Sequence, residues 1–271
     1  MPTISYRRHA EADEATQRVY EDIMRTYGLD EPRGIYLLMG HTPTHLAGSW
    51  PRSRYIYGRD TNFSVKEKHI FTLAISATNN CEYCCRSHTT RLRQLAMSDA
   101  EILEVLMVVD VTNGESKFAE GTRFGNNPVL PPMKDSRKTG HAGDPLDRDA
   151  DHLGGTGTFY ELMAYKPDYR SASWARRRMC FEEDGHLGVR LKHIIAFTVA
   201  ATTGADHLIR EHTARLRDLD ISQEEVAELL FIIDVVCGYN RYVQGVQVDP
   251  LEGQRKPWGR HADANKAASC G

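Results

Sequence analysis

The chain has 271 residues, of which 41% are hydrophobic and 26% are charged, and its formal net charge is −3. This length allows about two domains with a buried core, and the composition is ordinary for a soluble globular protein. No basic stripe favours nucleic-acid binding, no apolar run is long enough to span a membrane, and the N-terminus lacks the apolar core of a signal peptide. We therefore expect a cytoplasmic protein whose six cysteines are mostly reduced rather than paired in a disulfide framework.

Apolar residues at helical spacing predict helices along the whole chain, and no segment alternates like a strand. Two capping boxes, Ser64-Val65-Lys66-Glu67 and Ser98-Asp99-Ala100-Glu101, mark helix starts. The predicted helices of the first half are 15–27, 43–57, 64–77, 81–95 with Asn80 as its N-cap, and 98–111, and an apolar patch at 35–39 leads to the second of them. The sequence therefore predicts an all-α fold.

The sequence contains an internal duplication, because a shift of 124 residues aligns the two halves without a gap. His69 falls on His193 and His88 falls on His212, and a capping box at Ser222 opens the last helix of the second copy. We predict a first domain at residues 1–123, a Gly- and Pro-rich linker at 124–157, a second domain at 158–250, and a polar tail at 251–271 that holds an incidental Cys270.

Only the first copy carries clustered thiols. It reads Asn80-Cys81-Glu82-Tyr83-Cys84-Cys85-Arg86-Ser87-His88, whereas the second reads Gly204-Ala205-Asp206-His207-Leu208-Ile209-Arg210-Glu211-His212. The second copy keeps the frame and the last histidine but replaces all three sulfurs. This asymmetry predicts one chemically competent half and one supporting half.

The spacing of the thiols favours redox chemistry. Cys81 and Cys84 lie one helical turn apart at the start of a helix, where the helix dipole stabilises a thiolate and a disulfide can form. His88 follows one turn later and can accept or deliver a proton. Cys85 is also within reach of Cys81 and His88, so the spacing does not decide whether Cys84 or Cys85 is the attacking sulfur.

Other interpretations of these residues are less favoured. A structural zinc site needs four ligands, and Cys81, Cys84 and His88 supply three without a second CxxC motif. Inert buried thiols are the other alternative; Cys180 and Cys237, on apolar helices, are expected to be of that kind. A metal held by His193, His207 and His212, with Asp206 or Glu211, is a weaker possibility, and no flavin or nicotinamide motif is present, so no cofactor is expected.

The segment from Glu67 to His88 resembles the alkylhydroperoxidase D (AhpD)-like, or carboxymuconolactone decarboxylase, superfamily. The resemblance rests on Ala74-Ile75-Ser76-Ala77-Thr78-Asn79-Asn80-Cys81-Glu82-Tyr83-Cys84 and on the CxxCxxxH motif, and it extends over both copies. It implies an all-helical, commonly oligomeric protein in which Cys84 attacks, Cys81 resolves and His88 relays protons. The relay glutamate of the family pattern is replaced here by His69, and Glu67 is explained by its capping box.

Several other residues recur in both copies. The tryptophans Trp50 and Trp174 are expected in the core, and Asp110 and Asp234 are expected to satisfy buried partners. The charged pairs Lys68/Lys192 and Arg91/Arg215 are expected on solvated helix faces. For the recurring histidines, a structural hydrogen bond and acid–base chemistry both remain open.

The sequence thus favours a thiol-based oxidoreductase, of the peroxidase or disulfide reductase type, that forms a disulfide from Cys81 and Cys84 or Cys85. His88 and His69 would move protons, and an external dithiol would restore the thiols. The alternative is a decarboxylase-like lyase or isomerase that acts on a small organic acid with histidines as acid and base. A third possibility is a redox sensor without turnover. A homo-oligomer is expected, with no nucleic-acid or membrane partner.

Overall fold

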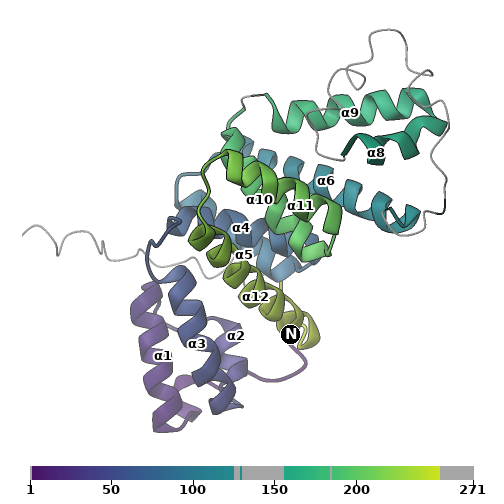
Figure 1. Cartoon of the computed structure of the whole chain (residues 1–271). Coiled ribbons are helices and arrows are strands. Elements are labelled where there is room, and N and C mark those ends of the chain that lie inside the picture. The colour runs from purple at the N-terminus through teal and green to yellow at the C-terminus, as the bar shows by residue number, and fades with distance from the viewer. Residues whose placement is uncertain (1, 125–128, 130–155, 184, 251–271) are drawn as a thin grey trace, which may run out of the picture. The chain divides into compact units, whose positions relative to one another are not determined.

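The fold is all-α, as the sequence predicts. The computed structural model describes residues 2–124, 129, 156–183 and 185–250, and no strand occurs among them. The α-helices in Figure 1 are α1 (Glu14–Tyr27), α2 (Gly34–Met39), α3 (Pro43–Tyr57), α4 (Val65–Thr78), α5 (Glu82–Gln94), α6 (Asp99–Thr122), α8 (Thr156–Glu161), α9 (Pro167–Phe181), α10 (Val189–Thr203), α11 (Asp206–Asp218) and α12 (Gln223–Gly245). Two 3₁₀ turns, His9–Glu11 and Leu162–Tyr165, complete the described structure.

The described helices form two compact units. Unit 1 comprises residues 1–102 and 223–271, and unit 2 comprises residues 103–222. Each unit therefore includes the long final helix of the other sequence copy: α12 belongs to unit 1, and most of α6 belongs to unit 2. The two sequence copies and the two compact units are thus different divisions of the same chain.

Helix α4 is the centre of unit 1. It packs against α3, α5 and α12, and every residue from Lys68 to Ser76 is buried. A helix that is apolar on all sides is stable only when it is surrounded, so the continuous run of apolar residues in α4 dictates its central position. The helices α3, α5 and α12 can therefore direct side chains towards one another at the surface of α4.

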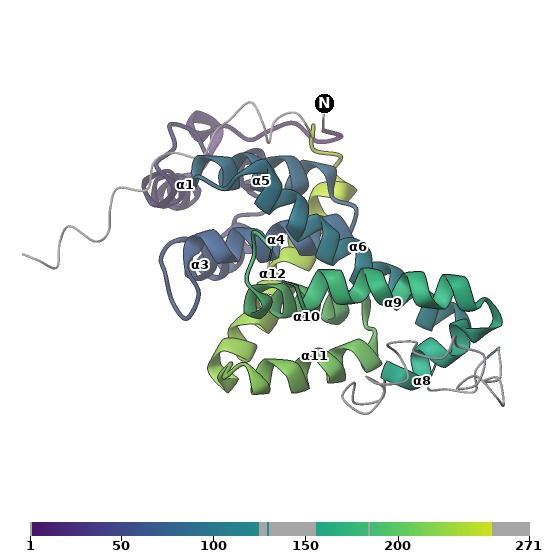
Figure 2. The same cartoon turned by 90° about the horizontal axis from the view of Figure 1, so that it is seen from above.

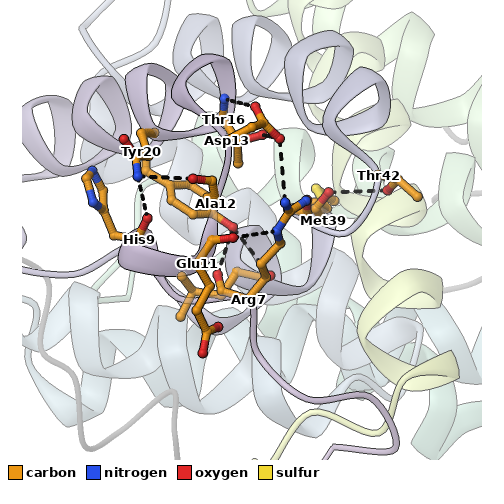
Figure 3. Close-up of polar contacts among 12 residues, drawn as sticks. Arg7, His9, Glu11, Ala12, Asp13, Thr16, Tyr20, Met39 and Thr42 are labelled. Carbon is orange, nitrogen blue, oxygen red and sulfur yellow. Dashed lines mark hydrogen bonds and ion pairs between the residues drawn. The ribbon is translucent and has the colours of Figure 1, made fainter.

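The N-terminal segment ties α1 to the end of α2, as Figure 3 shows. Arg7 Nη1 donates a hydrogen bond of 2.9 Å to the Gly40 carbonyl, and Tyr20 Oη donates to the Arg7 carbonyl at 3.0 Å. Asp13 caps α1 by accepting from the Thr16 N–H at 2.9 Å, which satisfies a free amide of the first turn. These contacts fix two helices that supply walls of the cavity described below.

Unit 2 is built around the pairing of α10 with α11, which lie side by side in Figure 2. Helix α9 packs against α10, and a cluster of Ala119, Phe159, Tyr160, Met163 and Trp174 forms an apolar core at the other end of α9. The expected core positions of Trp50 and Trp174 are confirmed, because their exposed fractions are 4% and 2%.

Helix boundaries agree with the sequence except at two places. The long helix α6 continues past Val111 to Thr122, and in this extension the hydroxyls of Ser116 and Thr122 donate to backbone carbonyls one turn earlier. The N-cap of α5 is Cys81, not Asn80. Asn80 has a φ of 56° and Gly204, its equivalent, a φ of 73°, so both copies need a left-handed residue in this turn.

The recurring lysines are buried, which corrects the expectation of solvated faces. Lys68 Nζ lies 3.2 Å from Glu228 Oε1 in unit 1, and Lys192 Nζ lies 2.7 Å from Glu104 Oε1 in unit 2. The two pairs are equivalent under the shift of 124 residues and join residues of different sequence copies. A buried ammonium is tolerated because a carboxylate compensates its charge.

Three further expectations change. Asp110 and Asp234 are about two-thirds exposed and form ion pairs with Arg176 and Arg52, so they do not satisfy buried partners. Arg91 is buried, whereas Arg215 is half-exposed as expected. Cys180 is buried, but Cys237 is only partly buried and accepts a hydrogen bond from Asn79.

The predicted linker at 124–157 and the tail at 251–271 lie almost wholly outside the described residues, and so does Cys270. Among the helices that are described, none is long and apolar enough to cross a membrane.

Candidate active site

The turn between α4 and α5 brings two of the clustered cysteines together. Cys81 and Cys84 form a disulfide with a Cα–Cα distance of 5.3 Å, and their exposed fractions are 1% and 6%. Cys81 is the N-cap of α5 and accepts the first helical hydrogen bond, from the Cys85 N–H, at 2.9 Å. Cys84 lies in the first turn, where unpaired amides favour a thiolate in the reduced protein.

Cys85 lies outside this pair. Its thiol is free and partly buried, and burial, assisted by the charge of Glu82, raises its pKa to about 11. A thiol with such a pKa is almost entirely protonated near pH 7 and is a poor nucleophile. Of the two candidates for the attacking sulfur, the surroundings favour Cys84.

His69 and His88 form a hydrogen-bonded pair behind Cys84. Their Nδ1 atoms are 2.8 Å apart, and the Tyr57 ring stacks on His69 with a centroid distance of 5.0 Å. Burial, together with the charge of Arg33, lowers the pKa of His88 to about 3. His88 is therefore neutral near pH 7, and a neutral imidazole can accept a proton but cannot pair with a thiolate as a cation.

A cavity of about 50 Å³ opens beside Cys84 and His88 in unit 1. Its walls come from α1 to α5 and from α12. Hydroxyl groups are the commonest polar groups among the described lining residues, which are Tyr27, Arg33, Ile35, Tyr36, Ser53, Tyr57, Thr72, Tyr83, Cys84, Ser87, His88, Val236, Tyr239, Asn240 and Val243. This volume holds a few water molecules or a ligand of a few heavy atoms.

Sequence reasoning missed the polar wall opposite α5. Arg33 is the N-cap of α2 and is 4% exposed, and Tyr36 and Tyr239 also line the cavity. Tyr36 Oη and Ser53 Oγ are 2.7 Å apart. The sequence contained one signal for this wall, the position of Arg33 directly before the apolar run Gly34–Met39. A charged residue next to a buried helix is rarely buried unless it has a polar partner.

The second copy keeps the histidine pair without the thiols. His193 and His212 have their Nδ1 atoms 3.1 Å apart, and Phe181, the equivalent of Tyr57, stacks on His193 at 5.1 Å. Burial lowers the pKa of His193 to about 2 and that of His212 well below its usual value. The pair is thus neutral and packs as part of the core of unit 2.

The weak expectation of a metal at His193, His207 and His212 is not supported by the geometry. His207 stacks on Phe159 with a centroid distance of 5.1 Å, away from the hydrogen bond that joins the other two rings. Across the described parts of the chain, no three His, Cys, Asp or Glu side chains are grouped as metal ligands.

A buried ion cluster occupies the positions in unit 2 that line the cavity in unit 1. Arg177 forms ion pairs with Glu115 and Glu211, and Tyr160 Oη donates to Glu115 at 2.5 Å. The shift of 124 residues places these four side chains on Ser53, Tyr239, Ser87 and Tyr36 of the cavity. At two of these positions the small residues Ser53 and Ser87 of the cavity are replaced by the longer charged side chains of Arg177 and Glu211.

Comparison with known proteins agrees with this architecture. The model of the carboxymuconolactone decarboxylase family matches residues 53–124 and 167–248, one match in each copy. A crystal structure from Burkholderia xenovorans LB400, of a protein provisionally described as a gamma-carboxymuconolactone decarboxylase subunit, is similar with a TM-score of 0.60 and 19% identity over 86% of this chain and 94% of that chain. No curated protein matches the sequence significantly. The family matches cover more than half of the chain, and the protein therefore belongs to the carboxymuconolactone decarboxylase family.

Proposed function

We propose that the protein is a thiol-based oxidoreductase that reduces a small peroxide at Cys84. The observation that carries the proposal is the Cys81–Cys84 disulfide at a cavity that Cys84 shares with His88. The cavity volume of about 50 Å³ suits hydrogen peroxide or a small organic hydroperoxide better than a ring-bearing organic acid.

The reaction would proceed in two balanced steps. His88 accepts the thiol proton, and the Cys84 thiolate attacks the peroxide ROOH; the O–O bond breaks, Cys84 becomes a sulfenic acid, and the alcohol ROH leaves with that proton. Cys81 then attacks the Cys84 sulfur, a disulfide forms, and water leaves. An external dithiol reduces the disulfide by exchange and is itself oxidised.

His69 would complete the proton path. Because the Nδ1 atoms of His69 and His88 share one hydrogen bond, one ring donates and the other accepts. A proton taken up at one ring can therefore be passed through the pair, so that His69 substitutes for the relay glutamate of the family pattern.

Stoichiometric oxidation tests the proposal. The purified, reduced protein is treated with one equivalent of hydrogen peroxide, and its free thiols, intact mass and peptide map are measured. We expect the loss of two thiols and two hydrogen atoms, mapped to Cys81 and Cys84. Unchanged thiols would contradict the proposal.

A decarboxylase-like lyase is the second candidate, favoured by the histidine pairs that persist in both units. The variant with Cys81, Cys84 and Cys85 all changed to Ser separates the two. A lyase should keep its turnover of organic acids in this variant, whereas the oxidoreductase should lose all peroxide turnover.

A further inference from the structure

The cavity beside Cys84 contains one buried cation. Among its described lining residues Arg33 alone carries a full charge, since no lysine, aspartate or glutamate is present and His88 is neutral. The guanidinium is 4% exposed, so water screens its field only weakly. Any anion formed in the cavity will therefore interact with Arg33.

Arg33 lies against the face of α5 that presents the reactive groups. Its Nη1 donates to Ser87 Oγ at 3.2 Å, and it interacts with the Tyr83 hydroxyl. Ser87 is three residues after Cys84 and four after Tyr83, so these residues share one side of the helix. The positive charge of Arg33 also contributes to the lowered pKa of His88, which places it near that ring, and Arg33 lines the same cavity as Cys84.

The phenols that line the cavity with Cys84 are neutral, whereas α5 also carries three charged residues that are not among the lining residues: Glu82, Arg86 and the buried Arg91. Burial raises the pKa values of Tyr27 from α1, Tyr36 from α2, Tyr57 from α3 and Tyr239 from α12, so these phenols stay protonated. Helix α4 contributes Thr72 to the cavity wall, and its His69 reaches the cavity only through the hydrogen bond to His88. The start of α5 adds only a partial positive charge.

The internal duplication provides an independent observation. The shift of 124 residues places Gly157 at the position of Arg33 and Leu208 at the position of Cys84. The copy that lacks the thiol therefore also lacks an arginine at this position, and its buried guanidinium, Arg177, is paired with Glu115 and Glu211. An arginine directly before this helix thus occurs in the copy that has the thiol and not in the other.

We propose that Arg33 is the electrostatic partner of the Cys84 thiolate and the positioning residue that makes this sulfur, rather than Cys85, nucleophilic. The inference rests on the proposed function, because it concerns the same sulfur. It adds a residue outside the repeated helical motif, at the start of α2. In the reduced protein the thiolate faces the guanidinium, and the proton it loses leaves through His88 to solvent, so that His88 returns to its neutral form.

The pH dependence of Cys84 alkylation tests this inference. Iodoacetamide labelling is measured by peptide mapping in a Cys81→Ser/Cys85→Ser background, in which no disulfide competes. Arg33→Gln should raise the apparent pKa of Cys84 by about 1–3 units, the usual effect of removing an adjacent opposite charge. Arg33→Lys keeps a positive charge at this position and should raise the pKa of Cys84 by less than Arg33→Gln does.

Arg86→Gln is the matched control, because it removes a nearby guanidinium of α5 that pairs with Glu82 at the surface. Water screens that pair, so the pKa of Cys84 should change by less than about half a unit. An unchanged pKa in Arg33→Gln, or equal shifts in Arg33→Gln and Arg33→Lys with a native circular dichroism spectrum, would overturn the inference. The measurement needs no peroxide, so its outcome is separate from the outcome of the oxidation test.

Discussion

Cys84 and Cys85 are neighbours in the sequence but lie in different electrostatic surroundings. Cys84 lines the cavity that contains Arg33. Cys85 is not among the lining residues; it is partly buried, and its pKa is raised to about 11. Only about one Cys85 thiol in 10⁴ is ionised at pH 7. The surroundings of the two sulfurs thus favour Cys84 as the attacking sulfur. The spacing of the motif gives no information about these surroundings.

Single substitutions at these two positions should behave oppositely. Cys85→Ser should retain peroxide-dependent loss of two thiols, with a rate within about twofold of the parent protein, whereas Cys84→Ser should lose it entirely. Stopped-flow thiol oxidation with peptide mapping measures both. A Cys85→Ser variant that no longer forms the Cys81–Cys84 disulfide would show that Cys85 takes part.

At the scale of elements, each long final helix is anchored by one buried ion pair. Glu228 of α12 meets Lys68 of α4, and Glu104 of α6 meets Lys192 of α10. Thr61 and the backbone N–H of Asn62 also donate to Glu228, so its carboxylate is fully used. The pair fixes the register of α12 on α4, and α12 in turn supplies Tyr239 and Asn240 to the cavity wall.

Removing one partner of this pair should be costly. Glu228→Gln leaves the Lys68 ammonium buried without its counter-charge and should lower the free energy of unfolding by about 3–5 kcal/mol. The double variant Lys68→Met/Glu228→Leu should recover most of that loss, because it buries no charge.

Urea denaturation followed by circular dichroism measures these differences. Glu224→Gln, an exposed glutamate of the same helix, is the control and should change the free energy of unfolding by less than about 0.5 kcal/mol. A Glu228→Gln variant as stable as this control would show that the buried pair contributes little to stability.

At the scale of the whole molecule, the two copies share one helical architecture but differ in the side chains of their interiors. Unit 1 keeps a cavity walled by hydroxyls, and unit 2 fills the equivalent positions with Arg177, Glu115 and Glu211. Both interiors also contain a hydrogen-bonded histidine pair. These histidines make the stability of the entire chain dependent on pH.

Acid should destabilise the protein over a defined range. The pKa values of His88 and His193 are lowered to about 3 and about 2, and that of His212 lies well below its usual value. Between about pH 6.5 and pH 3 the unfolded chain binds protons that the folded chain does not, so stability falls as the pH falls. The slope should reach about 1.4 kcal/mol per pH unit for each such histidine.

The slope, measured by denaturation at several pH values, identifies the groups. His88→Gln should reduce the slope by the contribution of about one histidine, whereas His41→Gln, at an exposed position, should leave the slope unchanged. A parent protein whose stability is flat from pH 6.5 to pH 4 would contradict the neutral, buried state of these rings.

The sequence alone was sufficient for the helices, the duplication and the motif. Apolar periodicity and capping boxes depend on neighbours within one or two turns, so α1, α3, α4 and the start of α6 are where local patterns place them. The spacing of Cys81, Cys84 and His88 along one helix is equally local. The structure places Cys81 at the N-cap of α5 and pairs it with Cys84, a choice that the spacing left open.

Only the tertiary structure decided which distant residues complete the interior. The pairing of Lys68 with Glu228, the approach of Arg33 to α5, and the filling of unit 2 by Arg177 all join residues more than 30 positions apart. A pattern of periodicity specifies which face of a helix is buried, but not which element covers it. Charged residues such as Lys68 and Arg33 therefore resemble solvated surface in the sequence, and only packing reveals that they are buried beside a partner.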